Sequence, residues 1–296
     1  MNFFWLFALL APICFSASNL VDNHVLHKRL NDPVSYDILT IWPTVPFAIV
    51  ILWAKGISTD FDAWFVGGAV GFVFAFLVIL YCYAMMQEQG TNVVSVIYTS
   101  PLFVTVLALL FLGEKLSALN YAGVFFLVAS AFLVLYKRVG AKNLGLVLMV
   151  FYALISAIAR VVTKSALEGV DVWSYFFWFL VGGIVGSMVL AAVRWPNLET
   201  AIRRLDFETW MLICTTTVFS TVGLVLLYSA FSLGSVTVAS GLTAISPTVL
   251  FLYSEVLVRL RPNAIPPDRI TGKGAVIRKA GAVLLVIVGA LALTGR

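Results

Sequence analysis

The chain has 296 residues, of which 61% are hydrophobic and only 11% are charged, and its mean hydropathy is +1.03. Soluble domains carry roughly 25% charged residues, so this composition excludes an ordinary water-soluble globular protein. The formal net charge of +5 does not require a nucleic-acid partner, because basic connections on one side of a membrane give the same balance.

Long apolar runs recur along the whole chain, each close to the roughly 20 residues that a helix needs to cross a hydrocarbon core of ~30 Å. The first run has no basic region before it and no small-residue cleavage site after it, so we interpret it as a membrane span and not as a secretory signal. The pattern predicts an all-α polytopic membrane protein of about ten transmembrane helices. They are expected at residues 3–26, 35–54, 63–86, 92–112, 118–136, 144–167, 172–193, 208–231, 236–258 and 277–294.

Most connections between these spans are short, but residues 194–207 form a longer one. Leu198, Ile202 and Leu205 would share one face of a helix there, with two arginines off that face. This spacing predicts a short helix lying in the membrane interface. A solvated loop is the alternative interpretation.

Lys and Arg residues are distributed unevenly between the two sides of the predicted bundle. Fourteen of them fall on one side, counting those at the start of the last span, and three fall on the other. The positive-inside rule makes the first side cytoplasmic and places both termini outside. The short connections and bare termini favour a prokaryotic plasma membrane.

The sequence contains an internal duplication. Ser100-Pro101 in the fourth span matches Ser246-Pro247 in the ninth, and Ala122-Gly123 in the fifth matches Ala280-Gly281 in the tenth. We therefore predict two repeats of five helices, at residues 1–138 and 142–296. Because five is odd, the two repeats must cross the membrane in opposite directions, and inverted repeats are typical of transporters that alternate access to a central site.

The segment SPLFVTVLALLFLGEKLSALNYAGVFFLVASAFLVL at 100–135 resembles the drug/metabolite transporter superfamily, in its ten-helix EamA type. It has an early proline, an apolar run that ends in Leu112-Gly113-Glu114, and a glycine-bearing next helix. The second copy departs from this pattern, with Leu260 where the first has Glu114. In addition, SNLVDNHVLHK at 18–28 resembles the end of the first helix in a subset of these proteins. The resemblance implies transport of a small solute, and members carry amino acids, sugars, nucleotide-linked sugars, amines or drugs.

Three polar residues, Asn19, Asp22 and Asn23, lie at helical spacing late in the first span. A charge inside a span costs about 2.5–3.5 kcal/mol on insertion scales, so this stripe is expected to face the bundle or a water-filled cavity. Asp22 could then exchange protons with a substrate or counter-ion. The alternative is that it lies near the headgroups and is solvated beside Lys28.

Arg160 and Lys164 follow Ser156 at intervals of four residues on the sixth span. Two cations on one face could bind a carboxylate or phosphate group, with arginine offering a bidentate fork. Alternatively, Lys164 extends to the nearby interface. Glu255 in the ninth span is either a coupling carboxylate or the partner of Arg259 in a structural ion pair.

Pro101 and Pro247 occupy matching positions in the two repeats, and each removes a backbone hydrogen bond from its helix. Matched helix interruptions point to the binding site of a transporter, although kinks that only aid packing are the alternative. We expect polar and aromatic residues near these breaks and in the second span to line the site. They are Trp42, Tyr98, Ser100, Thr243 and Ser246.

Motifs for other functions are missing from the sequence. It has no GxxxxGK[ST] motif for nucleotide binding, no HExxH and no GxSxG, so the sequence assigns no catalytic residue, cofactor or metal and no enzymatic activity. Cys14, Cys82 and Cys214 are far apart in apolar segments and are expected to be buried, unpaired thiols. We predict a secondary transporter in a lipid bilayer that moves a small molecule, as an exporter of amino acids or related compounds, driven by protons or by exchange. A lipid-carrier flippase or a non-transporting membrane subunit is the alternative, and an intramembrane enzyme is a less favoured one.

Overall fold

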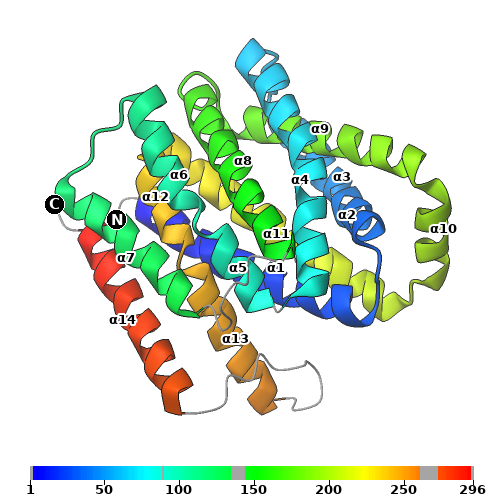
Figure 1. The fold of residues 1–296 in the computed structure, drawn as a ribbon. Helices are drawn as coiled ribbons and strands as arrows, with labels where there is room; N and C mark the ends of the chain where they lie inside the picture. Colours follow the sequence, from blue (N-terminus) through cyan, green and yellow to red (C-terminus); the bar gives the residue numbers. More distant parts are fainter. Residues whose placement is uncertain (1–2, 89, 135–143, 261–272, 295–296) are drawn as a thin grey trace.

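The computed structural model describes residues 3–88, 90–134, 144–260 and 273–294, and these residues are almost entirely helical (Figure 1). The first repeat contains α1 Phe3–Lys28, α2 Pro33–Ile41, η1 Trp42–Thr44, α3 Val45–Ala54, η2 Asp62–Gly67, α4 Gly68–Gln87, α5 Gly90–Ile97, α6 Ser100–Leu107, η3 Ala108–Leu112 and α7 Ala118–Val134. The second contains α8 Leu144–Ala166, α9 Val172–Val193, α10 Trp195–Arg204, α11 Phe207–Leu233, α12 Val236–Thr243, α13 Ser246–Leu260 and α14 Lys273–Thr294.

The predicted polytopic architecture is confirmed. Within the described residues, eight helical segments are long and apolar enough to cross a membrane, and two shorter apolar helices lie at Ala118–Ser130 and Gly281–Leu293. These two segments belong to α7 and α14, which are the predicted fifth and tenth spans. Residues 195–204 form the helix α10, in which Leu198 is buried and Ile202 is exposed.

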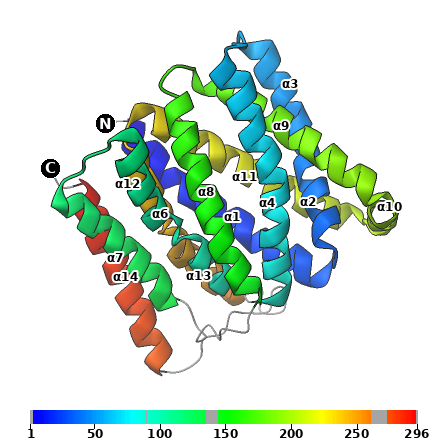
Figure 2. The same ribbon diagram turned by 45° about the horizontal axis from the view of Figure 1, so that its top comes forward.

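The two halves pack against each other in a reciprocal way. Helix α4 of the first half packs on α8 and α9 of the second, while α11 of the second half packs on α1 and α2 of the first. Helix α7 lies against α14, and α6 lies against α12 (Figures 1 and 2). Contacts that recur with the halves exchanged are those expected of two repeats related by a pseudo-two-fold axis.

Both matched Ser-Pro pairs interrupt their spans. Helix α5 ends at Ile97 and α6 begins at Ser100, while α12 ends at Thr243 and α13 begins at Ser246. A proline in the first turn of a helix is tolerated because the N–H it lacks would have no partner there. Pro101 and Pro247 are both buried, so these breaks lie inside the protein and not against lipid.

Close approach of two helix backbones joins α4 to α9. A Cβ atom added to Gly71 would collide with the backbone carbonyl of Phe179, and one added to Gly182 would collide with that of Gly68. Small residues at such a crossing allow the helices to approach more closely than side chains would permit. This contact fixes one wall of the interior described below.

All three cysteines are free thiols, as expected, but their burial differs from the prediction. Cys82 is buried on α4, whereas Cys14 and Cys214 are only half-buried. The reason is that α1 and α11, which carry Cys14 and Cys214, each turn one side toward the outer surface of the bundle and its exposed apolar side chains.

Candidate functional site

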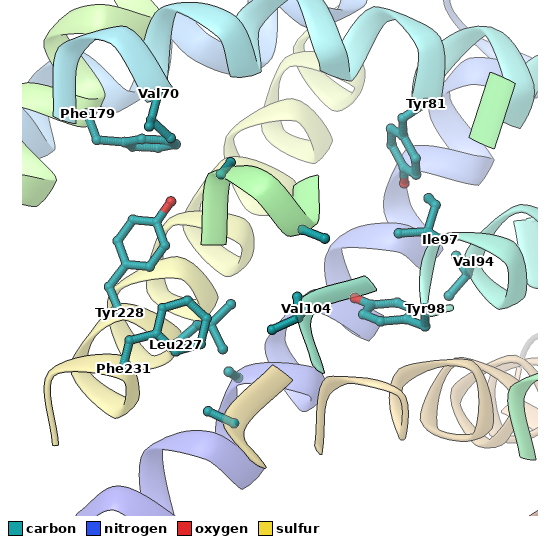
Figure 3. Packing of buried hydrophobic residues seen from close by; sticks show 14 of the residues in the cluster. Val70, Tyr81, Val94, Ile97, Tyr98, Val104, Phe179, Leu227, Tyr228 and Phe231 are labelled. Atoms are coloured by element: carbon teal, nitrogen blue, oxygen red, sulfur yellow. The ribbon is translucent and has the colours of Figure 1, made fainter. Parts of the chain in front are cut away.

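A cavity of about 240 Å³ lies between the two halves of the protein. Much of its wall is apolar and aromatic, and the hydroxyl groups of Tyr81, Tyr98 and Tyr228 point inward between the helices (Figure 3). The charged side chains among the described residues that line it are Asp22, Asp37 and Arg160. Its hydroxyl-bearing residues are Ser18, Tyr36, Thr40, Thr44, Tyr81, Tyr98, Tyr152, Ser156, Thr216, Ser220, Thr221 and Tyr228.

Asp22 is buried and surrounded by hydroxyl donors. Tyr36 donates to Oδ1 at 2.6 Å and Thr216 donates to the same oxygen at 2.5 Å. Tyr81 donates to Oδ2 at 2.8 Å, and Ser18 lies at 3.5 Å from that oxygen. A carboxylate has about four acceptor positions, so the acceptor capacity of Asp22 is nearly used by residues from three spans.

Asp37 lies one turn into α2, beside that cluster, and has the opposite surroundings. Asp32 caps the helix by accepting a hydrogen bond from the Ser35 backbone N–H at 3.3 Å, and Pro33 occupies its first turn. This start places Asp37 against the cavity with none of its surface exposed. Neither of its carboxylate oxygens has a hydrogen-bond partner among the described residues.

Arg160 reaches the cavity from the C-terminal half of α8. Its Nη1 donates to Thr243 Oγ1 at 3.2 Å, at the end of α12 beside the second helix break. Within the described part of the chain, no carboxylate forms an ion pair with it. A guanidinium has five N–H donors, so most of its donor capacity is available to a molecule in the cavity.

The EamA-like transporter family profile matches this sequence twice, over residues 3–136 and 143–265. The chain belongs to the EamA-like transporter family. One solved structure, described as "Crystal structure of protein", is similar to it with a TM-score of 0.75 and 17% identity, covering 98% of this chain and 96% of that one. That likeness supports the fold alone. No protein of curated function matches the sequence.

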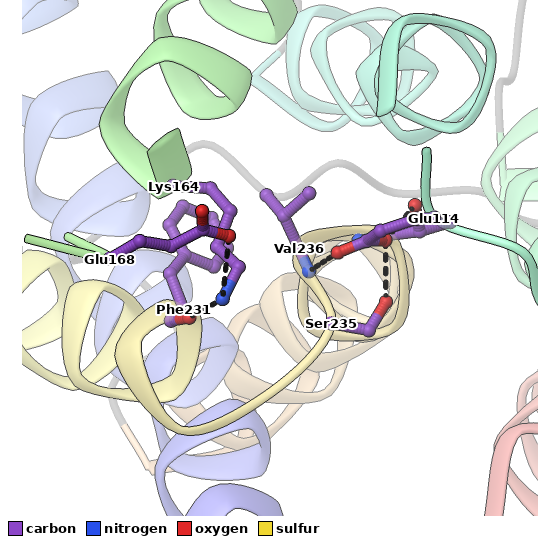
Figure 4. A network of polar contacts seen from close by, with 7 residues as sticks. Glu114, Lys164, Glu168, Phe231, Ser235 and Val236 are labelled. Atoms are coloured by element: carbon purple, nitrogen blue, oxygen red, sulfur yellow. Dashed lines mark hydrogen bonds and ion pairs between the residues drawn. The ribbon is translucent and has the colours of Figure 1, made fainter. Parts of the chain in front are cut away.

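Lys164, one turn beyond Arg160, does not line the cavity of this EamA-like protein. Its Nζ donates to the backbone carbonyl of Phe231 at 3.0 Å, close to the end of α11, and lies 3.9 Å from Glu168 (Figure 4). A cation near the C-terminus of a helix interacts favourably with the helix dipole. The predicted pair of cations is therefore divided between two regions.

Glu114, from the family motif Leu112-Gly113-Glu114, holds the start of α12. Its carboxylate accepts hydrogen bonds from Ser235 Oγ at 2.8 Å, the Val236 backbone N–H at 2.9 Å and Thr237 Oγ1 at 2.8 Å (Figure 4). The motif thus satisfies donors that a helix N-terminus leaves without partners. We call the region formed by Glu114, Lys164 and these partners the α11–α12 junction.

The other predicted residues fall into two groups. Asn19 and Tyr98 line the cavity, and Asn19 Oδ1 lies 2.9 Å from the Tyr81 hydroxyl that is bound to Asp22. Thr243 does not line the cavity itself, but it accepts a hydrogen bond from Arg160, which does. The remaining candidates do not line it: they are Asn23, Trp42, Ser100, Pro101, Ser246, Pro247 and Glu255.

The structure explains three of these positions. Asn23 packs against Met85, with Nδ2 at 3.9 Å from the sulfur. Ser246 packs on α1, where its carbonyl accepts a hydrogen bond from Ser16 at 3.0 Å. Glu255 has an exposed side chain, and the Arg259 side chain that was predicted to pair with it lies outside the described residues.

Four residues of this region were not predicted from the sequence: Asp37, Tyr36, Tyr81 and Thr216. Asp37 is the only charged residue of the predicted second span, which was a usable signal. The hydroxyl donors carried no comparable signal, because tyrosine and threonine are common in membrane helices and only the fold brings them to Asp22.

Proposed function

We propose that this EamA-like membrane transporter moves a small organic solute through the cavity between its two halves, without ATP. The observation that carries the proposal is that both halves supply charged side chains to one interior cavity: Asp22 and Asp37 from the first, Arg160 from the second. A solute bound there would touch both halves at once. Movement of one half against the other would then open the cavity to either side of the membrane in turn.

Amino acids or related compounds are the solute class that we propose, with export as the direction. Arginine presents a planar fork of donors that suits a carboxylate, and Arg160 has no carboxylate partner among the described residues. Energy would come from a proton gradient or from exchange with a second solute. A prokaryotic plasma membrane is the location we propose for this activity.

A lipid-carrier flippase draws less support from the structure. A lateral depression lies between α1, α11 and α13, and the described residues around it include Cys14, Phe219 and Tyr253 but no charged side chain. A flippase needs polar groups that accompany a lipid headgroup across the membrane. The charged groups lie instead in the central cavity, which favours a solute small enough to enter it.

The test is solute flux in proteoliposomes that contain the purified protein. A panel of radiolabelled amino acids, amines, sugars and nucleosides is measured with and without an imposed pH gradient. We expect flux of at least one solute, and a fall of about tenfold or more in Arg160→Gln, since removing one partner of a desolvated charge pair costs 2–5 kcal/mol.

The matched control is Arg203→Gln, which removes an arginine from the exposed side of α10. Its flux is expected to equal that of the wild type. Flux that is unchanged in Arg160→Gln, or that falls equally in both variants, would remove the cavity from the transport route.

A further inference from the structure

Asp37 is a buried acid for which the described residues supply no ion-pair partner. Its side chain is fully buried and lines the cavity, and both of its oxygens are without a donor in the described structure. Taking an ion out of water costs several kcal/mol unless a partner replaces the lost hydration. A carboxylate in this position therefore favours the arrival of a cationic group.

The neighbours of Asp37 cannot supply that group. Tyr36, the preceding residue, gives its hydroxyl to Asp22 and not to Asp37. Tyr81 from α4 is also engaged by Asp22. Cys82 from α4 and Tyr152 from α8 line the same cavity as Asp37, but neither carries positive charge at neutral pH.

Arg160 is the cation of the cavity, and it forms no ion pair with Asp37. Tyr152 lies on the same helix as Arg160, and both line the same cavity as Asp37. The wall of the cavity thus holds an acid and a base that are not joined to one another in the described structure. Apolar side chains such as Phe15, Phe74 and Phe179 form much of the wall around them.

We infer that Asp37 binds an ammonium group of the solute while Arg160 binds its anionic group, so that the cavity takes a small organic zwitterion with an apolar body. The inference rests on the proposed transport function and adds the residue that recognises the cationic end. A zwitterion gives a partner to both groups and leaves the net charge of the cavity unchanged. A proton on Asp37 would neutralise that residue but would give no acceptor to the N–H donors of Arg160.

The test measures binding by calorimetry to the full-length protein in lipid nanodiscs. The probes form two matched sets: phenylalanine, phenethylamine and 3-phenylpropionate, and alanine, ethylamine and propionate. Within each set the apolar body is similar and the charged groups differ: the first compound has both charges, the second only the ammonium group and the third only the carboxylate. Wild type, Asp37→Asn and Arg160→Gln are compared with Asp62→Asn, which removes an exposed acid outside the cavity.

We expect the wild type to bind the zwitterion of at least one set most tightly. Asp37→Asn should weaken binding of that zwitterion and of its amine by about tenfold or more and leave its carboxylate unaffected, because truncating one partner of a desolvated charge pair costs 2–5 kcal/mol. Arg160→Gln should show the reverse pattern, and Asp62→Asn should match the wild type.

Two results would overturn this assignment. One is ammonium binding that is equal in Asp37→Asn and the wild type. If that variant then changed only the pH dependence of flux, Asp37 would be a proton carrier and not an ammonium site. The other is a wild type that binds none of the ammonium probes. A protein that still transports an anionic or neutral solute in proteoliposomes would then keep the proposed function. Conversely, Asp37-dependent binding without flux of any solute would remove the transport proposal and keep this one.

Discussion

Two pairs of charged residues in this protein differ in how their charges are partnered: Glu114 and Lys164 at the α11–α12 junction, and Asp37 and Arg160 in the cavity. At the α11–α12 junction, Glu114 accepts several hydrogen bonds and Lys164 donates to a helix carbonyl. In the cavity, Asp37 accepts no hydrogen bond within the described structure, and Arg160 donates one. Partnered charges hold elements together, whereas charges without partners reduce stability and are retained for another purpose. The stability of variants can therefore separate the two roles.

The largest loss of stability is expected for Glu114→Ala. This variant removes the acceptor of four donors at the start of α12, and a hydrogen bond to a charged group contributes about 1.5–3 kcal/mol. Neighbouring water or backbone groups would replace part of this, so we expect the free energy of unfolding to fall by about 3 kcal/mol. Unfolding is followed by tryptophan fluorescence during denaturant titration in detergent micelles.

Glu114→Gln is the control, because it keeps one side-chain oxygen as an acceptor and should lose roughly half as much. If Glu114→Ala instead abolished flux at unchanged stability, Glu114 would belong to the solute route and the contrast between the two regions would fail.

Asp22→Asn is expected to have the next largest effect. The amide nitrogen of asparagine would replace one of the two carboxylate oxygens. It would then face either the Tyr81 hydroxyl or the hydroxyls of Tyr36 and Thr216, and the hydroxyls it faces would lose their acceptor. Leaving buried donors unsatisfied costs about 1–3 kcal/mol, so we expect a loss of about 2 kcal/mol in the same unfolding assay. If flux fell in Asp22→Asn while the free energy of unfolding stayed unchanged, Asp22 would have the proton-coupling role that was considered from the sequence.

The spans and the helix breaks are the parts of the structure that could be predicted from the sequence. Hydropathy predicts the spans because each helix must satisfy its own backbone in lipid, whatever its neighbours are. The breaks at Pro101 and Pro247 were predictable for the same local reason. Helical spacing correctly placed Arg160 and Lys164 on one face of α8, but it does not give depth, and one turn carries Lys164 from the cavity to the end of α11.

The partners of each charge were beyond the reach of the sequence. Glu114 finds its donors more than 120 residues further along the chain, and Asp22 meets Thr216 across 194 residues. Asp22 and Asp37 both look like single acids in apolar helices. Only the assembled fold shows that one is surrounded by hydroxyls and the other is not.

A smaller effect is expected for Lys164→Met, which keeps the apolar stem and removes the charge. The lost contacts are the hydrogen bond to Phe231 and a 3.9 Å approach to Glu168, whose side chain is 61% exposed. An exposed pair of this kind adds little, and a single charged hydrogen bond dominates, so the expected loss is about 1 kcal/mol. Flux in this variant should stay close to that of the wild type. A loss of flux equal to that of Arg160→Gln would show that Lys164 serves the solute after all.

The smallest effect on stability is expected for Asp37→Asn, and it is the sharpest test of the comparison. The amide has nearly the shape of the carboxylate, no donor in the described structure loses its acceptor, and the penalty for burying a charge disappears. We expect the free energy of unfolding to stay within about 0.5 kcal/mol of the wild type or to rise, even though solute binding is lost. Asp22→Asn is the matched control, since it makes the same chemical change in the same cavity. A loss in Asp37→Asn as large as in Asp22→Asn would mean that Asp37 supports the fold, and the opposition between partnered and available charges would no longer hold.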